Sequence, residues 1–365
     1  MSRVELDKVW KIYPRGNVVG VKDLSFTIQD KEFLAILGPS GGGKSSTLRM
    51  LAGLEEISRG EIRFDGQPVN QLGPAERNIA LAFESYALYQ RLSVYENIAF
   101  PLRARKMKKA AVHEKVMSIA ELLDLKDLLK KYPSSLAGGQ QQRVSLGRAF
   151  VRQPNLTLLD EPISHMDQRV RAEIRARIRH LHDEMKNTTV YVTHDQAEAV
   201  SLCDRMVILH KAELQQIGTV EEIWSRPANR FVAFFVGEPA MNFLPAKVEG
   251  ERLTVSSAQG PRRLTLPAAV PAKYSGKELT LGLRPQQLKV HRREPSGDSL
   301  PGKLRLIEFQ GETTVLTLSV GGESGGEMKA VVAATERFET GQTVWLSAEA
   351  KNIHLFDGEE AIFKK

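Results

Sequence analysis

A continuous apolar run, Phe33 to Leu37, is followed at once by a glycine-rich segment, Gly38 to Ser45. Such a run predicts a strand that is buried on both faces, and leucines at helical spacing predict a helix over residues 44–54. A second and a third buried strand are predicted later in the chain. A glycine-rich loop between a buried strand and a helix therefore predicts a layered α/β domain.

The loop has the pattern of a phosphate-binding P-loop: glycine, four residues, glycine, lysine and serine. Glycines let the backbone curl so that its N–H groups and the start of the helix face phosphates. We expect Lys44 to reach the β- and γ-phosphates of ATP and Ser45 to bind Mg²⁺. The alternative, an accidental glycine-rich turn, is disfavoured by the flanking strand and helix. The residues predicted to hold the nucleotide here are Gly38, Ser40, Gly41, Gly43, Lys44, Ser45 and Ser46.

Two further apolar runs, 156–159 and 188–192, predict buried strands that end at polar residues. The first is followed by Asp160 and Glu161. Asp160 is expected to hold Mg²⁺, and Glu161 to orient or deprotonate an attacking water. Adjacent acids at the end of a strand are common, so the interpretation depends on the P-loop upstream and on His194 downstream.

The chain changes character near residue 237. Residues 1–236 fit an α/β domain in which about 85–153 is mostly helical and is expected to form an inserted subdomain. Residues 237–365 contain short alternating runs separated by prolines. This pattern predicts a small all-β barrel of the OB-fold kind.

Composition limits the cellular location of the chain and the kinds of molecule that it could bind. No stretch approaches the roughly 20 apolar residues of a membrane-spanning helix. The N-terminal residues have no apolar signal core and Cys203 is the only cysteine, so a cytosolic location is expected. The net charge of +7 is compatible with binding to nucleic acid, with binding to an anionic membrane surface, or with solubility alone. The basic stretch 169–179 favours the solvated face of an amphipathic helix over a nucleic-acid site.

The segment from Leu136 to Gln140, followed by two glutamines and an arginine, resembles the signature of the ATP-binding-cassette family with one change. In that family the signature completes the ATP site of the opposing subunit, so the resemblance implies a head-to-tail pair of cassettes around two nucleotides. It also makes His194 the switch histidine that contacts the γ-phosphate. The further nucleotide contacts that the resemblance implies are Tyr13, which stacks on adenine, the signature residues Ala137, Gly138, Gly139 and Gln140, and the D-loop residue Asp167. Ordinary packing is the alternative for Tyr13.

Further segments narrow the resemblance to ATPase subunits of maltose, sn-glycerol-3-phosphate and glycerol importers; these segments are 85–89, 94–100, 241–245, 282–285 and 354–357. The resemblance implies ATP hydrolysis coupled to uptake of a sugar, glycerol, glycerol phosphate or polyol. It implies a second ATPase subunit, two membrane-spanning permease subunits and, indirectly, an external solute-binding protein. It places the chain at the cytoplasmic face of the inner membrane, with no nucleic-acid partner. Residues 86–89 would transmit force to the permease, or would simply pack as aromatics.

Two positions at the nucleotide depart from the family pattern, and the D-loop has His165 and Met166 where asparagine and leucine are usual. Glu84 stands where glutamine is usual, and it is expected to act both as a catalytic group and as a ligand of Mg²⁺. Ala137 stands where serine is usual, which removes a hydroxyl donor to a phosphate oxygen. Glu84 belongs to this chain's own site and Ala137 to the partner's. We therefore expect pairing with a second, related ATPase subunit; the alternative is a homodimer.

Two other functions remain open at this point. A catalytically weakened regulatory cassette would explain Glu84 and Ala137. Retention of Lys44, Asp160 and His194 argues against it. A non-transport cassette would be expected to carry a coiled-coil insertion, a zinc module or a second cassette, which the sequence lacks. The last domain is expected either to stabilise a dimer or to receive a regulatory signal.

Overall fold

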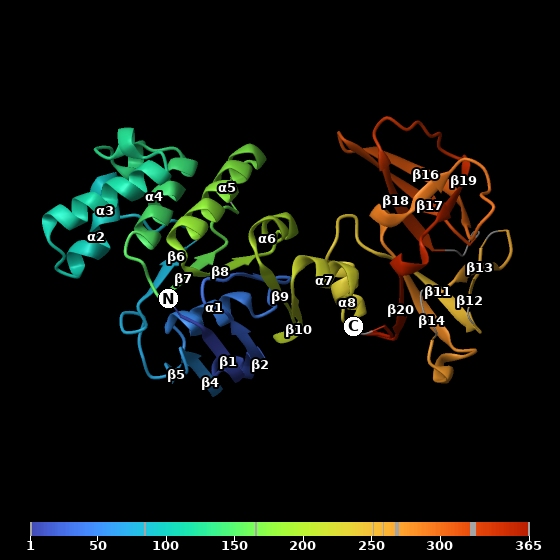
Figure 1. Cartoon of the computed structure of the whole chain (residues 1–365), viewed down its shortest axis with the longest axis horizontal. Helices are drawn as coiled ribbons and strands as arrows, with labels where there is room; N and C mark the ends of the chain where they lie inside the picture. Colours follow the sequence, from blue (N-terminus) through green and yellow to red (C-terminus); the bar gives the residue numbers. More distant parts are fainter. Residues whose placement is uncertain are drawn as a thin grey trace. The chain divides into compact units, whose positions relative to one another are not determined.

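The structure, a computed structural model, describes residues 2–83, 85–164, 166–250, 252–257, 259–266, 270–321 and 326–363. The chain divides into two units, Met1–Val220 and Glu221–Lys365 (Figure 1). The first unit is α/β and the second is almost entirely β, as predicted. Residues 221–236, which the sequence assigned to the first domain, group here with the second unit. The domain limits 1–236 and 237–365 stay a prediction.

The central sheet of the first unit has six strands in the order β10-β9-β3-β8-β7-β6. Its strands are β3 (Phe33–Leu37), β6 (Ile79–Ala82), β7 (Leu156–Asp160), β8 (Thr188–Thr193), β9 (Arg205–His210) and β10 (Glu213–Gly218). All pairings are parallel except that of the edge strand β10. The three buried strands predicted from apolar runs are confirmed as β3, β7 and β8, because all of β3 and β8 and all but the last residue of β7 are buried.

A second, antiparallel sheet of four strands lies in the same unit, in the order β2-β1-β4-β5. Its strands are β1 (Val4–Tyr13), β2 (Val18–Ile28), β4 (Arg59–Phe64) and β5 (Gln67–Pro68). One core joins the two sheets and helix α1 (Lys44–Ala52), through residues such as Ile36 and Leu48. The helix ends before the predicted limit at 54, because Gly53 adopts φ 73° and its N–H bonds to the carbonyls of Arg49 and Met50.

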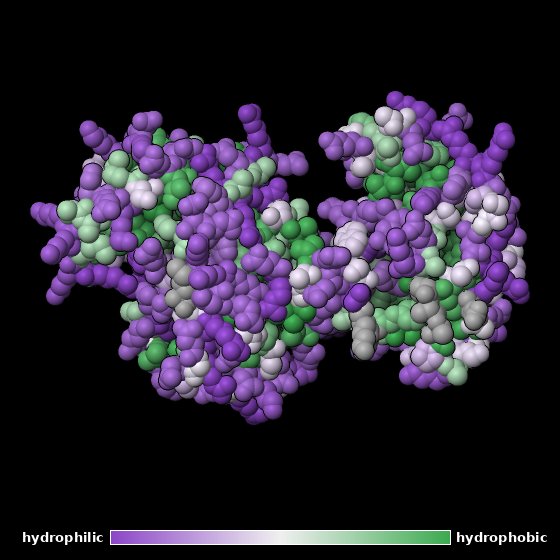
Figure 2. Space-filling model, in the orientation of Figure 1, coloured by the Kyte–Doolittle hydropathy of each residue, from purple (hydrophilic) through white to green (hydrophobic). Residues whose placement is uncertain are grey.

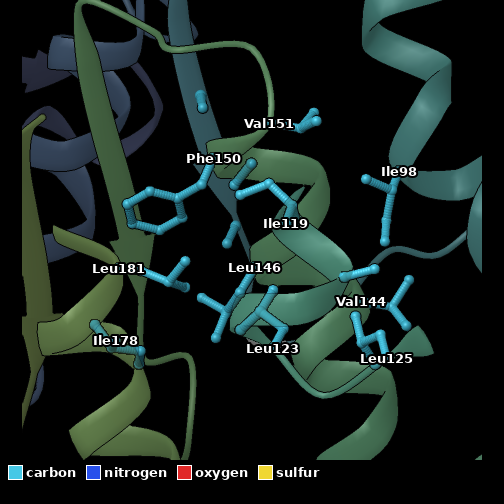
Figure 3. Packing of buried hydrophobic residues seen from close by; sticks show 14 of the residues in the cluster. Ile98, Ile119, Leu123, Leu125, Val144, Leu146, Phe150, Val151, Ile178 and Leu181 are labelled. Carbon is cyan, nitrogen blue, oxygen red and sulfur yellow. The ribbon is translucent and has the colours of Figure 1, made fainter. Parts of the chain in front are cut away.

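The other helices of this unit are α2 (Val94–Ala104), α3 (Lys109–Leu122), α4 (Gly138–Phe150), α5 (Gln168–Met185) and α6 (Gln196–Leu202). Side chains from α2, α3, α4 and α5 meet in a single apolar cluster, which includes Ile98, Ile119, Val144, Phe150 and Leu181 (Figure 3). Helix α4 therefore belongs both to the helical region and to the layer that packs on the central sheet.

The predicted amphipathic helix over 169–179 lies within α5. Ile174 and Ile178 are fully buried. Arg177 and Arg179 on the outer side form ion pairs with neighbouring carboxylates, as a solvated basic face does. Among the described residues, none of the helices is both long and apolar enough to cross a membrane.

The second unit contains two β-sheets around one apolar core. The first sheet consists of β13 (Arg262–Thr265), β12 (Arg252–Val255), β11 (Asn242–Glu249), β14 (Glu278–Leu283), β20 (Ile353–Asp357) and β21 (Glu360–Ala361). The second consists of β15 (Lys289–His291), β19 (Thr343–Ser347), β16 (Leu300–Phe309), β17 (Thr313–Ser319) and β18 (Glu327–Ala333). Two short helices, α7 (Val220–Ser225) and α8 (Arg230–Phe235), precede the sheets.

Buried Arg284 ties α7 to this β-unit. Its guanidinium lies 4.0 Å from the ring centroid of Trp224 and donates to the carbonyls of Trp224 and Val236 at 2.9 and 2.6 Å. Burial lowers the pKa of Arg284 to about 10. The arginine therefore holds the residues that join the helices to the sheets.

Candidate active site

Three loops meet at the carboxyl edge of the central sheet because the strands that precede them pair in register. Leu37 of β3 lies opposite Thr193 of β8, and Asp160 of β7 lies opposite Val192. The next residues along the three strands are therefore Gly38, Glu161 and His194, at one edge of the sheet. The carboxyl edge of a parallel α/β sheet is where ligands bind.

The P-loop between β3 and α1 needs glycine for steric reasons. A Cβ at Gly38 would lie 2.3 Å from the carbonyl oxygen of Leu209. At Gly43, where φ is 101°, a Cβ would lie 2.7 Å from the carbonyl oxygen of Gly20. The first turn of α1 contains no acidic residue. The curled loop and the positive end of the helix thus fit an anion such as a phosphate.

Lys44 is coupled to the acids across the site. Its side chain is buried, and Nζ donates to the carbonyls of Gly38 at 2.9 Å and Pro39 at 3.2 Å. Burial lowers the pKa of Lys44, while the charges of Glu161 and Asp160 oppose that shift. The P-loop lysine and the two acids therefore lie close enough to interact electrostatically.

Glu161 and His194 contact each other directly. Nδ1 of His194 lies 3.1 Å from Oε2 of Glu161. Glu161 has φ 44°, in the left-handed region that a residue with a side chain rarely adopts. Its N–H bonds to the carbonyl of Val192 at 2.9 Å, so the strained turn is fixed to the end of β8. Backbone strain of this kind gathers at functional sites.

Glu198 positions the turn that carries His194, and the sequence reading overlooked it. This buried carboxylate accepts hydrogen bonds from Tyr191 at 2.9 Å and from Thr193 at 2.7 Å. Burial raises the pKa of Glu198. The signal was present, because Asp195 and Glu198 have the spacing of a capping box, and the Asp195 carboxylate does accept from the Glu198 N–H at 3.1 Å.

Tyr13, at the end of β1, borders a cavity of about 280 Å³ beside the P-loop. The cavity is lined by Tyr13, Val18, Val19, Gly20 and residues 41–46. The Tyr13 hydroxyl lies 3.0 Å from Oγ of Ser46, and Nζ of Lys11 lies 4.9 Å from the centre of its ring. Val18 and Val19 are exposed and add an apolar wall that the sequence reading did not identify. The cavity combines an anion cradle with an apolar and aromatic side.

The residues at 137–140 form the start of α4. Ala137 precedes the first turn, and its N–H donates to Oε1 of Gln140 at 3.1 Å. A complete capping box also needs a side-chain oxygen at the N-cap that accepts from the backbone N–H of Gln140. Alanine has no such oxygen, so only half of the capping box is present. Among the described residues, no hydrogen bond or ion pair joins 137–140 to the P-loop. A Cβ at Gly139 would instead lie 3.0 Å from Val170 of α5.

Asp167 precedes α5, and its carboxylate accepts from the N–H of Val170 at 3.0 Å. Val170 is in turn the α5 residue that lies beside Gly139. Arg171, one turn further along, donates to the carbonyls of Ser164 and Met166, both at 2.8 Å. Sequence reasoning did not find this arginine, because carbonyl contacts leave no pattern in the sequence.

Glu84 and His165 lie outside the described residues. The backbone after Glu84 is left-handed at Tyr86 (φ 59°) and Ala87 (φ 47°). Arg148 of α4 donates to the carbonyls of both residues, at 3.0 and 2.7 Å. Ser145 donates to the Tyr86 carbonyl as well, at 3.1 Å. Helix α4 thus holds the segment that follows Glu84.

A groove of about 660 Å³ lies next to this segment. Its lining residues are Leu54, Pro74, Ala75, Ile79, Ala80, Leu81, Phe83, Tyr89, Phe100, Pro101, Ala104, Arg105, Arg148, Ala149 and Arg152. The rings of Tyr89 and Phe100 are 4.6 Å apart and more than two-fifths exposed. Buried Asn97 fixes the backbone of Tyr89, through bonds of 2.9 and 3.1 Å to its N–H and carbonyl. Burial and the charge of Arg105 lower the pKa of Arg152 to about 10.

The donors at the sheet edge suit Mg²⁺ bound together with phosphate. Among the described residues, no group of three or more histidine, cysteine, aspartate or glutamate side chains could hold a metal alone. Ser45 is exposed at the start of α1, and Asp160 ends β7. One carboxylate and a hydroxyl match the usual coordination of Mg²⁺, which takes its remaining oxygens from phosphates and water.

Both units of the chain are similar to known proteins. The chain matches family models described as ABC transporter over residues 21–164, MalK OB fold domain over 237–288 and TOBE domain over 281–356. It is 47% identical over 289 residues to the trehalose import ATP-binding protein SugC of Mycobacterium tuberculosis, covering 79% of this chain and 73% of the relative. It is 40% identical over 361 residues to the sn-glycerol-3-phosphate import ATP-binding protein UgpC of Chromobacterium violaceum, covering 98% and 95%.

Among solved structures, the chain is similar to a dimeric post-hydrolysis state of the ATP-binding cassette MJ0796 bound to ADP and Pi. The identity is 28% and the TM-score 0.53, over 60% of this chain and 98% of that one.

Replacing Gly43 by alanine is expected to weaken nucleotide binding by roughly 10-fold or more, because the new Cβ strains the backbone and collides with the carbonyl of Gly20. Titration with a fluorescent ATP analogue measures the effect. Gly66→Ala is the matched control, because Gly66 is also left-handed (φ 76°) but a Cβ there has nothing within 4 Å. Equal affinities for the two variants would contradict the steric role of the loop.

Proposed function

This chain belongs to the ATP-binding-cassette transporter family, and on that premise we propose that it binds ATP with Mg²⁺ and hydrolyses it to power a membrane importer. The proposed cargo is a small polar solute of the sugar, glycerol or glycerol phosphate class. The observation that carries the proposal is the convergence of Lys44, Glu161 and His194 on one sheet edge. Relatives named for trehalose and sn-glycerol-3-phosphate import support the solute class.

The P-loop and its helix hold the triphosphate in this proposal. Loop N–H groups and the start of α1 receive the β- and γ-phosphates, and Lys44 exchanges its carbonyl partners for phosphate oxygens. Ser45 and Asp160 hold Mg²⁺, which when bound neutralises charge on the phosphates. Tyr13, Val18 and the cavity beside them receive the base.

Glu161 and His194 act on the γ-phosphate end. Glu161 orients the attacking water and accepts its proton. Nδ1 of His194 faces Glu161, so Nε2 is the ring nitrogen left to contact a γ-phosphate oxygen.

The second half of each site is proposed to come from a partner cassette. Residues 137–140 make no described bond to the P-loop of their own chain, and the N-terminus of α4 offers backbone N–H groups at Gly138 and Gly139. A head-to-tail pair would set this end against the partner's γ-phosphate, with Asp167 at the seam. The dimeric state of the MJ0796 cassette supports such a pair.

The groove is proposed to receive a cytoplasmic helix of a permease subunit. Exposed Tyr89 and Phe100 offer apolar anchors, and arginines rim the groove. Residues 86–89 connect the groove to Glu84, so nucleotide-driven movement of this segment would reach the permease. The chain then lies at the cytoplasmic face of the inner membrane with two permease subunits, and an external binding protein delivers the solute to them.

Glu161→Gln is the direct test of hydrolysis. The amide keeps the size of the side chain but cannot accept the water's proton, so turnover should fall by about 100-fold or more while ATP affinity is retained. Phosphate release and nucleotide titration separate the two quantities, with exposed Glu308→Gln as control. A wild-type chain that binds ATP yet shows no turnover in the assembled importer would instead support the regulatory cassette.

The double change Tyr89→Ala and Phe100→Ala tests the groove. Loss of two aromatic anchors is expected to weaken permease binding by roughly 30-fold or more and to abolish uptake. ATPase activity of the cassette pair without permease should be unchanged. Co-purification with the permease and solute uptake are the measurements. Phe309→Ala removes an aromatic that is 69% exposed in the second unit, and an equal loss there would contradict the proposal.

Ala137→Ser tests the proposed pairing with a second, related subunit. In the Glu161→Gln background, the chain alone should remain monomeric with ATP, whereas the added hydroxyl should strengthen ATP-driven self-association by about 10- to 100-fold. Light scattering with and without ATP measures whether each variant is a monomer or a dimer. A fully active symmetric dimer of the unmodified chain would show that no paralogous partner is required.

A further inference from the structure

A dense group of basic side chains lies where α2 passes into α3. Residues 103–109 contain five basic residues and no acid; we call them the basic corner, Arg103, Arg105, Lys106, Lys108 and Lys109. All five are exposed. Figure 2 shows hydrophilic side chains projecting at the left of the molecule, where Figure 1 places these helices. The corner is distinct from the nucleotide site.

The backbone of the basic corner is fixed. Lys106 adopts φ 58°, and its N–H bonds to the carbonyl of Arg103 at 2.8 Å. The N–H of Met107 bonds to the carbonyl of Leu102 at 3.2 Å, and Leu102 is buried in the helical core. The charges are therefore displayed from a defined turn that is anchored to the core.

The basic corner breaks the ordinary rule for the start of a helix. The positive end of a helix favours acids, yet Lys108 precedes the first turn of α3 and Lys109 begins it, without any acid in that turn. The Lys108 side chain makes no capping bond. Local rules are usually broken where function requires it. Here the helix end and the lysines together make a surface suited to anions.

The acids of α3 do not pair with the basic corner in the part of the chain that the structure describes. Glu114, the nearest of them along the helix, is exposed, and Glu121 and Asp124 at the far end pair with Lys126 and Arg177. Arg105 bonds to the neutral amide of Asn78, and Arg103 lies over the ring of Tyr95. Among the described residues, no ion pair with a carboxylate involves the basic corner.

The basic corner is continuous with the groove, because Pro101, Ala104 and Arg105 line the groove wall. We propose that the basic corner binds the anionic phospholipid headgroups of the cytoplasmic leaflet beside the permease. The orientation rests on the proposed function, since a permease helix in the groove brings this end of α2 towards the membrane. Each lysine or arginine near an anionic bilayer adds attraction, which falls off over a Debye length of about 8 Å.

A bilayer fits the corner better than a nucleic acid. Single-stranded nucleic acid is usually bound by cations together with aromatic rings on which bases stack. No aromatic residue occurs within 103–109, and the exposed rings of Tyr89 and Phe100 belong to the groove, which the permease helix is proposed to fill. A bilayer surface needs only a group of cations on a convex turn.

Vesicle flotation of the full chain tests the proposal. The chain is mixed with phosphatidylcholine vesicles that contain or lack phosphatidylglycerol, at low and at physiological salt. We expect binding only to the anionic vesicles, and weaker binding at physiological than at low salt. The variant Lys106→Gln/Lys108→Gln/Lys109→Gln should bind on the order of 100-fold more weakly.

The matched control removes the same charge elsewhere. Lys247, Lys303 and Lys329 are exposed on strands of the second unit, and their change to glutamine should leave vesicle binding nearly intact. An equal loss of vesicle binding in the control would show that only the net charge of the chain matters, and it would overturn the proposal. Binding of single-stranded RNA but not of anionic vesicles by the unmodified chain would also overturn it. ATP titration of each variant checks folding and tests the proposed function separately, because flotation requires no hydrolysis.

Discussion

The in-register parallel pairing of β3, β8 and β7 is the constraint on which the site depends. Residues 38, 161 and 194 are far apart in the chain, yet each follows the last residue of a paired strand. Apolar residues fix this register, because the strands are buried almost throughout. The chemistry at the edge is consequently separable from the stability of the sheet. Polar residues at the strand ends can change while the buried strands continue to bring the three loops together.

Features that arise from neighbouring residues were predictable from the sequence. Buried strands, the P-loop and the β-rich second unit are local patterns, and the family resemblance drawn from the motifs is confirmed. The residues that position these motifs were not found. Arg148 binds carbonyls 61 and 62 residues away in the chain, and Glu198 binds side chains across a turn. Bonds to distant carbonyls leave no periodicity or motif, so only the folded chain reveals them. The roles of individual site residues, Glu84 above all, stay predictions.

Left-handed backbone occurs in two of the segments that the nucleotide is proposed to move. Glu161 is left-handed beside His194, and Tyr86 and Ala87 are left-handed in succession between Glu84 and the groove. Such conformations cost of order 1–3 kcal/mol each and persist only where the surroundings impose them. Arg148 and Ser145 impose them on Tyr86 and Ala87 through three hydrogen bonds. A segment held in strain by a few bonds is one that a modest change in those bonds can release.

Helix α4 connects this strained segment to the end proposed to face a partner's nucleotide. Its N-terminus carries residues 137–140, and Ser145 and Arg148 lie further along the same helix. A helix of 13 residues is about 20 Å long and moves nearly as a rigid body. A shift imposed at Gly138 by a partner's phosphate would therefore reach the groove through Arg148, without any change within the central sheet. Because the groove and the end proposed to face a phosphate lie on one helix, closure of the cassette pair and movement of the permease would be mechanically linked in the proposed assembly.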